Sequence, residues 1–135
     1  MTGVTQIAFR GRSQLPDRRP GTNVEITHKV PNEPGRDRKY SVTFGFDPKT
    51  YDVREIFIWP QRTGADLDAV ITDACIGISH ALQRGASIAD LASAFGQLRP
   101  EGAPDGEYPP ASPLGTILRA GIEIERLEKR EQRVS

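Results

Sequence analysis

The chain is poor in the residue types that build most metal and redox sites. Its 135 residues include one cysteine, Cys75, and two histidines, His28 and His80. A single cysteine excludes an internal disulfide and any zinc site that needs two thiolates. We therefore expect no metal and no cofactor, and a lone thiol fits the reducing environment of the cytoplasm.

An excess of charge of one sign and long hydrophobic runs are also missing. The 18 basic residues balance the 18 acidic ones, which removes the electrostatic reason to expect a nucleic-acid partner. No apolar stretch reaches the length of a signal peptide or a membrane span, so we expect a cytoplasmic protein with no membrane partner. The glycines do not have the spacing of a nucleotide-binding loop.

Apolar residues alternate with polar ones in the first half of the chain beyond residue 22. This pattern predicts strands over about residues 24–30, 40–46 and 54–59. The last of these has apolar side chains on both faces and so requires cover on both faces, or a partner chain. Residues 1–22 contain four arginines and two prolines with little periodicity, which predicts a basic flexible arm.

Helical periodicity begins near Asp66 and predicts a helix to about residue 84, where Gly85 suits a left-handed end. Ser87 has the spacing of a helix cap for a short second helix, and Pro113 suits the first turn of a third. We predict one α+β domain over residues 23–125, in which a three-stranded antiparallel sheet is followed by three helices packed on it. The charged residues 126–135 are expected to form a solvent-exposed tail.

Four polar residues are candidates for ligand binding. Arg62, Arg84 and Arg99 lie at or near expected loops, where guanidinium groups can converge on a phosphate or a carboxylate. His80 lies on the polar face of the first helix, one turn before Arg84. Arg84 can equally well serve to cap the C-terminus of the helix, and His80 can simply belong to a solvated surface.

The remaining chemistry-bearing residues are interpreted as structural. His28 shares a strand face with apolar residues, which favours a packed or hydrogen-bonded histidine. Cys75 has no base or cation among its helical neighbours, so we interpret it as a small buried hydrophobe. No set of acid, base and nucleophile can be assembled from the sequence.

Several short segments occur in an order and spacing that are together specific. They are residues 15–18 (LPDR), 27–30 (THKV), 54–58 (REIFI), 78–85 (ISHALQRG), 91–92 (LA), 98–102 (LRPEG) and 112–114 (SPL). With these segments the chain resembles the C-terminal region of adenosylcobalamin-dependent (vitamin B12-dependent) ribonucleotide reductases, a region also found as a small stand-alone domain called TSCPD. The resemblance implies a link to nucleotide metabolism and to the supply of deoxyribonucleotides for DNA synthesis.

The chain departs from the reductases in its catalytic residues. Those enzymes use a radical-bearing cysteine and a reducing cysteine pair, and Cys75 alone cannot supply this set. The family often carries a cysteine after a Thr-Gly pair, where this chain has Ala65. The resemblance therefore implies an accessory or regulatory domain without independent activity, with a reductase subunit and a nucleotide as candidate partners. The alternative is a self-associating structural or small-ligand-binding domain unrelated to reductase activity.

Overall fold

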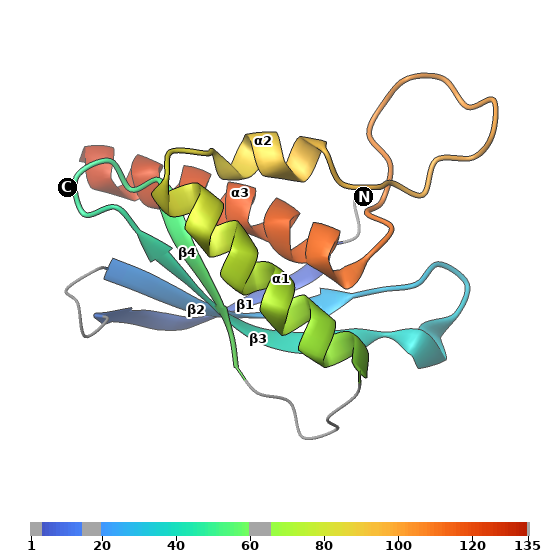
Figure 1. Ribbon diagram of the computed structural model, residues 1–135, viewed down its shortest axis with the longest axis horizontal. Coiled ribbons are helices and arrows are strands. Elements are labelled where there is room, and N and C mark those ends of the chain that lie inside the picture. Colours follow the sequence, from blue (N-terminus) through green and yellow to red (C-terminus); the bar gives the residue numbers. More distant parts are fainter. Residues whose placement is uncertain (1–3, 15–19, 60–65, 135) are drawn as a thin grey trace.

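The computed structural model describes residues 4–14, 20–59 and 66–134. Within these residues, four strands form one antiparallel sheet in the order β1-β2-β3-β4. The strands are Val4–Gln14 (β1), Pro20–His28 (β2), Arg38–Phe46 (β3) and Val53–Ile58 (β4). The helices that follow are Asp66–Gln83 (α1), Ile88–Ser93 (α2) and Pro113–Val134 (α3) (Figure 1). The α+β class and the order of strands before helices are confirmed.

The alternating residues of β2 and β3 build one wall of the core. Val24 pairs with Val42 and Ile26 pairs with Tyr40 in the register, and all four side chains are buried. Burial of each such side chain stabilises the fold by roughly 1.5–3 kcal/mol. Because α3 packs above this wall, the apolar row of the period-two pattern faces the core, as predicted. The other face is more covered than a half-buried sheet implies, since Thr27 and Thr43 are buried as well.

A glycine allows α3 to approach the sheet closely. A Cβ atom at Gly121 would lie 2.4 Å from Cδ1 of Ile88 in α2 and 2.8 Å from Cε1 of Phe44 in β3. Both distances are far below van der Waals contact. Gly121 is therefore the point where α2, α3 and the sheet meet.

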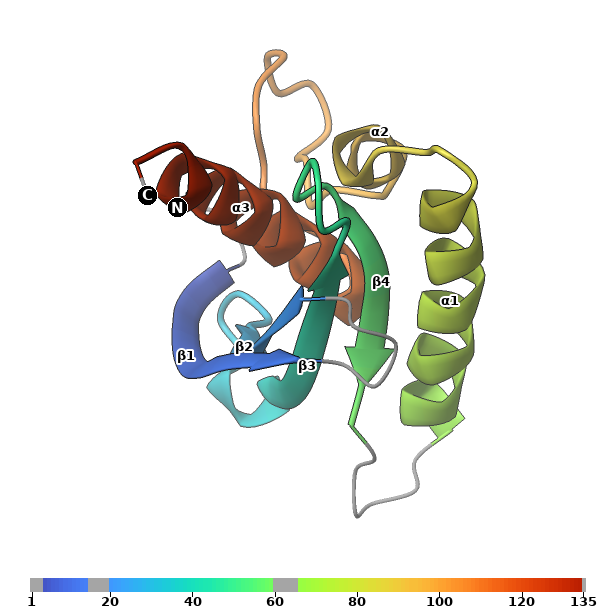
Figure 2. The same cartoon turned by 90° about the vertical axis from the view of Figure 1, so that its left-hand side faces the viewer.

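The helix α1 runs beside β4, on the side away from β3 (Figure 2). The backbone N–H of Ile56 donates to Oγ of Ser79 at 2.9 Å, and the same hydroxyl donates to the carbonyl of Ile56 at 3.2 Å. Arg54 donates to the carbonyls of Leu82 and Ala86 at the end of α1, at 3.0 and 3.2 Å. Because an open sheet edge invites pairing with another chain, α1 protects this edge.

The caps that the sequence predicts are present. Oγ of Ser87 accepts the backbone N–H of Asp90 at 3.0 Å, and Gly85 has a φ of 108° at the end of α1. The third helix begins at Pro113, directly after Ser112, as predicted.

The expectation of a flexible arm over residues 1–22 is wrong for residues 4–14 and for Pro20, Gly21 and Thr22. Residues 4–14 form β1, which pairs antiparallel with β2, with Phe9 opposite Val24. The register shifts between Val4 and Ile7 and again between Phe9 and Arg12. Such bulges interrupt the alternation of side chains that marks a strand in a sequence. Residues 15–19 lie outside the described part of the chain.

The expectation of a solvent-exposed charged tail over residues 126–135 is wrong for Glu128 and Lys129, and α3 continues to Val134. Glu128 is 6% exposed and accepts a hydrogen bond from the Thr22 hydroxyl at 3.3 Å. The ammonium of Lys129 pairs with the carboxylate of Asp52, the residue directly before β4. Arg130, Glu131, Arg133 and Val134 are exposed, as expected. The folded unit therefore extends beyond the predicted boundary at residue 125.

Candidate functional site

Two of the four ligand-binding candidates lie together on the exposed end of α1. Nη1 of Arg84 lies 3.2 Å from Nδ1 of His80 and donates to the carbonyl of His80 at 3.2 Å. Arg84 therefore satisfies a carbonyl at the end of its own helix, the alternative considered for it in the sequence. Arg62 lies outside the described residues.

Arg99 makes its contacts within its own loop. Its guanidinium donates to the carbonyl of Ala103, at 2.6 Å from Nη2, and pairs with Asp105 at 3.0 Å. It also lies over the ring of Tyr108, with Cζ 5.9 Å from the centroid. These bonds hold the projecting loop between α2 and α3 in shape, and they join Arg99 to its own loop rather than to His80 or Arg84.

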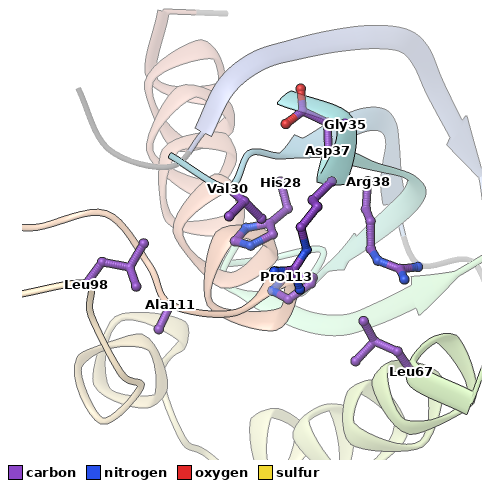
Figure 3. Close-up of a pocket in the computed structure, with 10 residues that line it drawn as sticks. His28, Val30, Gly35, Asp37, Arg38, Leu67, Leu98, Ala111 and Pro113 are labelled. Atoms are coloured by element: carbon purple, nitrogen blue, oxygen red, sulfur yellow. The ribbon is translucent and has the colours of Figure 1, made fainter. Parts of the chain in front are cut away.

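A cleft of about 510 Å³ lies at the other end of the helical layer, and His80, Arg84 and Arg99 are not among its lining residues. One side is the connection between β2 and β3, which includes the 3-10 turn Pro34–Arg36 (η1). The opposite side is formed by Leu98, Ala111 and Pro113 around the start of α3 (Figure 3). The volume lies within the range of small-molecule sites. We take this cleft as the candidate functional site.

The imidazole of His28 forms the floor of the cleft. The residue is 5% exposed, and its Nδ1 lies 2.7 Å from Oγ1 of Thr116 on α3. Burial lowers the pKa of His28 from its ordinary value, and the charge of Asp37 partly opposes this shift. The ring is therefore held neutral near neutral pH.

Two arginines from the β2–β3 connection line the cleft. Nη1 of Arg38 lies 3.5 Å from Oδ1 of Asp68 in the first turn of α1. The hydroxyl of Tyr40 donates to the same carboxylate at 3.4 Å, and burial, together with the Asp68 charge, raises the pKa of Tyr40 to about 12. Arg36 makes a 3.5 Å ion pair with Glu33 at the surface. One side of the cleft is thus lined by cationic side chains, and the ion pair of Arg38 with Asp68 links this side to α1.

The start of α3 is capped by its own chain. The N–H of Gly115 donates to Oγ of Ser112 at 3.1 Å, and the N–H of Thr116 donates to the carbonyl of Ser112 at 3.1 Å. Pro113 has no N–H. The amides that a helix start usually offers to an anion are therefore mostly occupied, and the charge of the cleft comes from its side chains.

The geometry around the cleft does not assemble a catalytic set from the described residues. His28 and Thr116 have the spacing of a base and a nucleophile, but Thr116 is 0% exposed and no substrate can reach it. Cys75 is 1% exposed, and burial raises the pKa of its thiol to about 12, so it is not a thiolate nucleophile. The described part of the chain also holds no cluster of three or more residues that could ligate a metal.

Comparison with known proteins adds no relative. No family model, curated protein or solved structure matches the chain. Within the described residues, no helix is long and apolar enough to cross a membrane. The function must therefore be argued from the cleft and from the sequence.

The residues that line the cleft were not among the ligand-binding candidates. The sequence gives an indication of a site at His28, because this polar residue ends the buried row Val24-Ile26-His28 of one strand. The indication for Arg36 and Arg38 is weaker. Both follow a turn-rich segment that brings them back beside that row. The sequence could not indicate that the start of α3, some 75 residues later, closes the other side.

Proposed function

We propose that the protein is an accessory or regulatory domain, related to adenosylcobalamin-dependent ribonucleotide reductases, that acts in the supply of deoxyribonucleotides without catalysis of its own. The observation that carries this proposal is the cleft beside His28. It has the size of a ligand site, and among the described residues it offers cationic and apolar side chains but no accessible nucleophile. Such a site supports binding rather than turnover.

The order of the segments that resemble the TSCPD domain supports the link to a reductase. One of them, residues 27–30, contains His28 at the floor of the cleft, and another, residues 112–114, contains Pro113 at its wall. Two segments far apart in the sequence thus meet at the same site. The resemblance therefore includes part of the lining of the cleft, whereas Arg36 and Arg38 lie outside the resembling segments.

Association with a reductase is the direct test of this proposal. The tagged full-length chain is incubated with the adenosylcobalamin-dependent reductase of the same organism and recovered by affinity chromatography. We expect the reductase to be retained on the wild-type protein and not on an unrelated small protein with the same tag. Recovery of equal background amounts from both would reject a reductase partner.

A second candidate function, self-association, is favoured by one observation on β4. The rings of Phe57 and Trp59 pack edge to face with centroids 5.0 Å apart and remain 47% and 46% exposed. Exposed aromatic pairs are common at protein interfaces. Association through the backbone edge of β4 is disfavoured, because Ser79 occupies both polar groups of Ile56.

Analytical ultracentrifugation separates this candidate from the first. If the aromatic pair is a subunit interface, the wild-type protein and the control V70S sediment as dimers at micromolar concentration, whereas F57S sediments as a monomer. Val70 is a suitable control because it is 63% exposed on α1, away from β4. A monomeric wild-type protein would exclude self-association.

A further inference from the structure

We propose that the cleft beside His28 binds the phosphate group of a nucleotide-sized phosphate ester, held by the imidazole of His28 and the guanidinium groups of Arg36 and Arg38. This inference rests on the proposed function, in which the protein binds rather than converts a ligand. It names the chemical class of that ligand and the residues that recognise it.

The first support is the convergence of three nitrogen-bearing side chains on one cavity. His28 ends β2, Arg36 lies in the turn η1 and Arg38 begins β3, so the short connection brings all three to one side of the cleft. Asp37 is the one carboxylate among the described lining residues. Figure 3 shows its carboxylate directed away from the His28 ring. The lining itself therefore carries two cationic side chains and one anionic side chain, and the carboxylates of Glu33 and Asp68 are the counter-ions of the arginines.

The second support is the position of the His28 ring in the wall of the cleft. The bond to Thr116 fixes the ring orientation and occupies Nδ1. His28 is 5% exposed and lines the cleft, so the fixed ring can present its second nitrogen, Nε2, to a ligand there. A phosphate suits both tautomers of the His28 ring. The dianion accepts a hydrogen bond from Nε2 when Nε2 carries the proton, and the monoanion donates one to Nε2 when it does not.

The third support is that neither arginine is saturated. Each arginine makes a 3.5 Å ion pair, Arg36 with Glu33 and Arg38 with Asp68, and the two arginine side chains are 69% and 42% exposed. A guanidinium has five N–H donors and binds the oxygens of a phosphate in pairs. The exposed pair of Arg36 with Glu33 is worth about 0–1 kcal/mol, so a dianionic ligand can displace Glu33 without large cost. The Asp68 side chain is 12% exposed, so a ligand would bind Arg38 through its other N–H groups and leave that pair in place.

The apolar wall indicates a ligand larger than inorganic phosphate. Leu67 and Leu98 lie on opposite sides of the His28 ring in Figure 3, and they are 39% and 41% exposed. Together with Pro113 they offer a hydrophobic surface to whatever the phosphate carries. A cavity of about 510 Å³ is large enough for a phosphate together with a sugar or a ring. We therefore expect a phosphate ester to bind more tightly than the free anion.

The test is a titration followed by nuclear magnetic resonance of the backbone amides. Three probes are added separately to the full-length protein at millimolar concentration: ADP, inorganic phosphate and adenosine. We expect saturable shifts confined to residues 28–38 and the start of α3 with ADP, weaker shifts at the same amides with phosphate, and none with adenosine. Equal shifts with ADP and adenosine, or no saturable shift with either anion, would overturn the inference.

Three variants assign the site. R36Q changes a surface residue, so it keeps the fold, and it is expected to weaken ADP binding about tenfold; R38Q acts in the same direction. R126Q is the matched control, since Arg126 is exposed on α3 and pairs with Glu123; it is expected to bind ADP like the wild type. ADP affinity unchanged in both R36Q and R38Q would overturn the inference. If the wild-type protein associates with the reductase but does not bind ADP, this site alone is rejected, whereas absence of association of the wild-type protein would reject the proposed function.

Discussion

His28 has a buried ring that ends at the candidate site. Burial lowers the pKa of His28 in the native protein below its pKa in the unfolded chain. At a pH between these two pKa values the unfolded chain therefore binds more protons than the native protein. Stability contributed by neutral His28 is complete above the unfolded pKa and is lost as the pH falls toward the folded one. We predict a lower free energy of unfolding in urea at about pH 5.5 than at about pH 7.5, with a smaller pH dependence in H28Q.

The matched control for this prediction is H80Q, because His80 is the other histidine of the chain and is exposed. H80Q is expected to retain the pH dependence of the wild type. The comparison uses the slope with pH rather than the absolute stability, since H28Q also loses the bond to Thr116. A wild-type slope in H28Q would show that His28 is not held neutral by burial.

Cys75 provides a second test at the level of single residues. Its thiol is 1% exposed with a pKa raised to about 12 by burial, so it is protected both from reagents and from ionisation. We predict no reaction with iodoacetamide at about pH 8 in the native protein and complete reaction in denaturant, measured by mass spectrometry. Rapid labelling of the native protein would contradict this burial and would make Cys75 a candidate nucleophile.

The edge of β4 depends on one hydroxyl of a neighbouring helix. Ser79 bonds both the N–H and the carbonyl of Ile56, so S79A leaves two backbone groups without partners at the side of the sheet. We predict a loss of about 1–3 kcal/mol in the free energy of unfolding, measured by urea denaturation. S93A is the control, because Ser93 is exposed and its hydroxyl donates to the carbonyl of Asp90 within its own helix. If S79A were as stable as S93A, the hydroxyl would not cap the edge.

The packing of α3 predicts opposite effects of one substitution at two helical glycines. G121A places a methyl group against Ile88 and Phe44 and is expected to destabilise the protein by about 1–3 kcal/mol. G77A adds a methyl group where no atom lies within 4 Å, and its better helix propensity is expected to stabilise α1 by about 1 kcal/mol. Thermal unfolding followed by circular dichroism measures both. Similar effects of the two substitutions would contradict this close approach of α3 to the sheet.

For the whole molecule, the sequence predicted what repeats within one element and missed what depends on distant partners. The alternation of Val24 and Ile26 and the caps at Gly85 and Ser87 are local signals, and the structure confirms them. The strand β1 was missed because its bulges break the alternation. The end of α3 was missed because Glu128 is buried only through Thr22, about a hundred residues away in the chain.

In the candidate site, too, features within one element were predictable and contacts between distant segments were not. The positions of His80 and Arg84 on one helix face were predictable from the helical period, but Arg99 turns back into its own loop. The cleft joins His28 of the sheet to Pro113 of α3, and that contact depends on how the helices pack across the sheet. No local pattern encodes such a meeting of segments.

The most direct measurement of the central claim is the turnover of the adenosylcobalamin-dependent reductase of the same organism, with increasing amounts of this protein in the assay. We predict that the protein alone forms no deoxyribonucleotide and that it changes the rate of the reductase in a saturable way, with R126Q behaving as the wild type. A reductase rate that stays constant up to a large excess of the protein would contradict the claim, and so would deoxyribonucleotide formation by the protein alone.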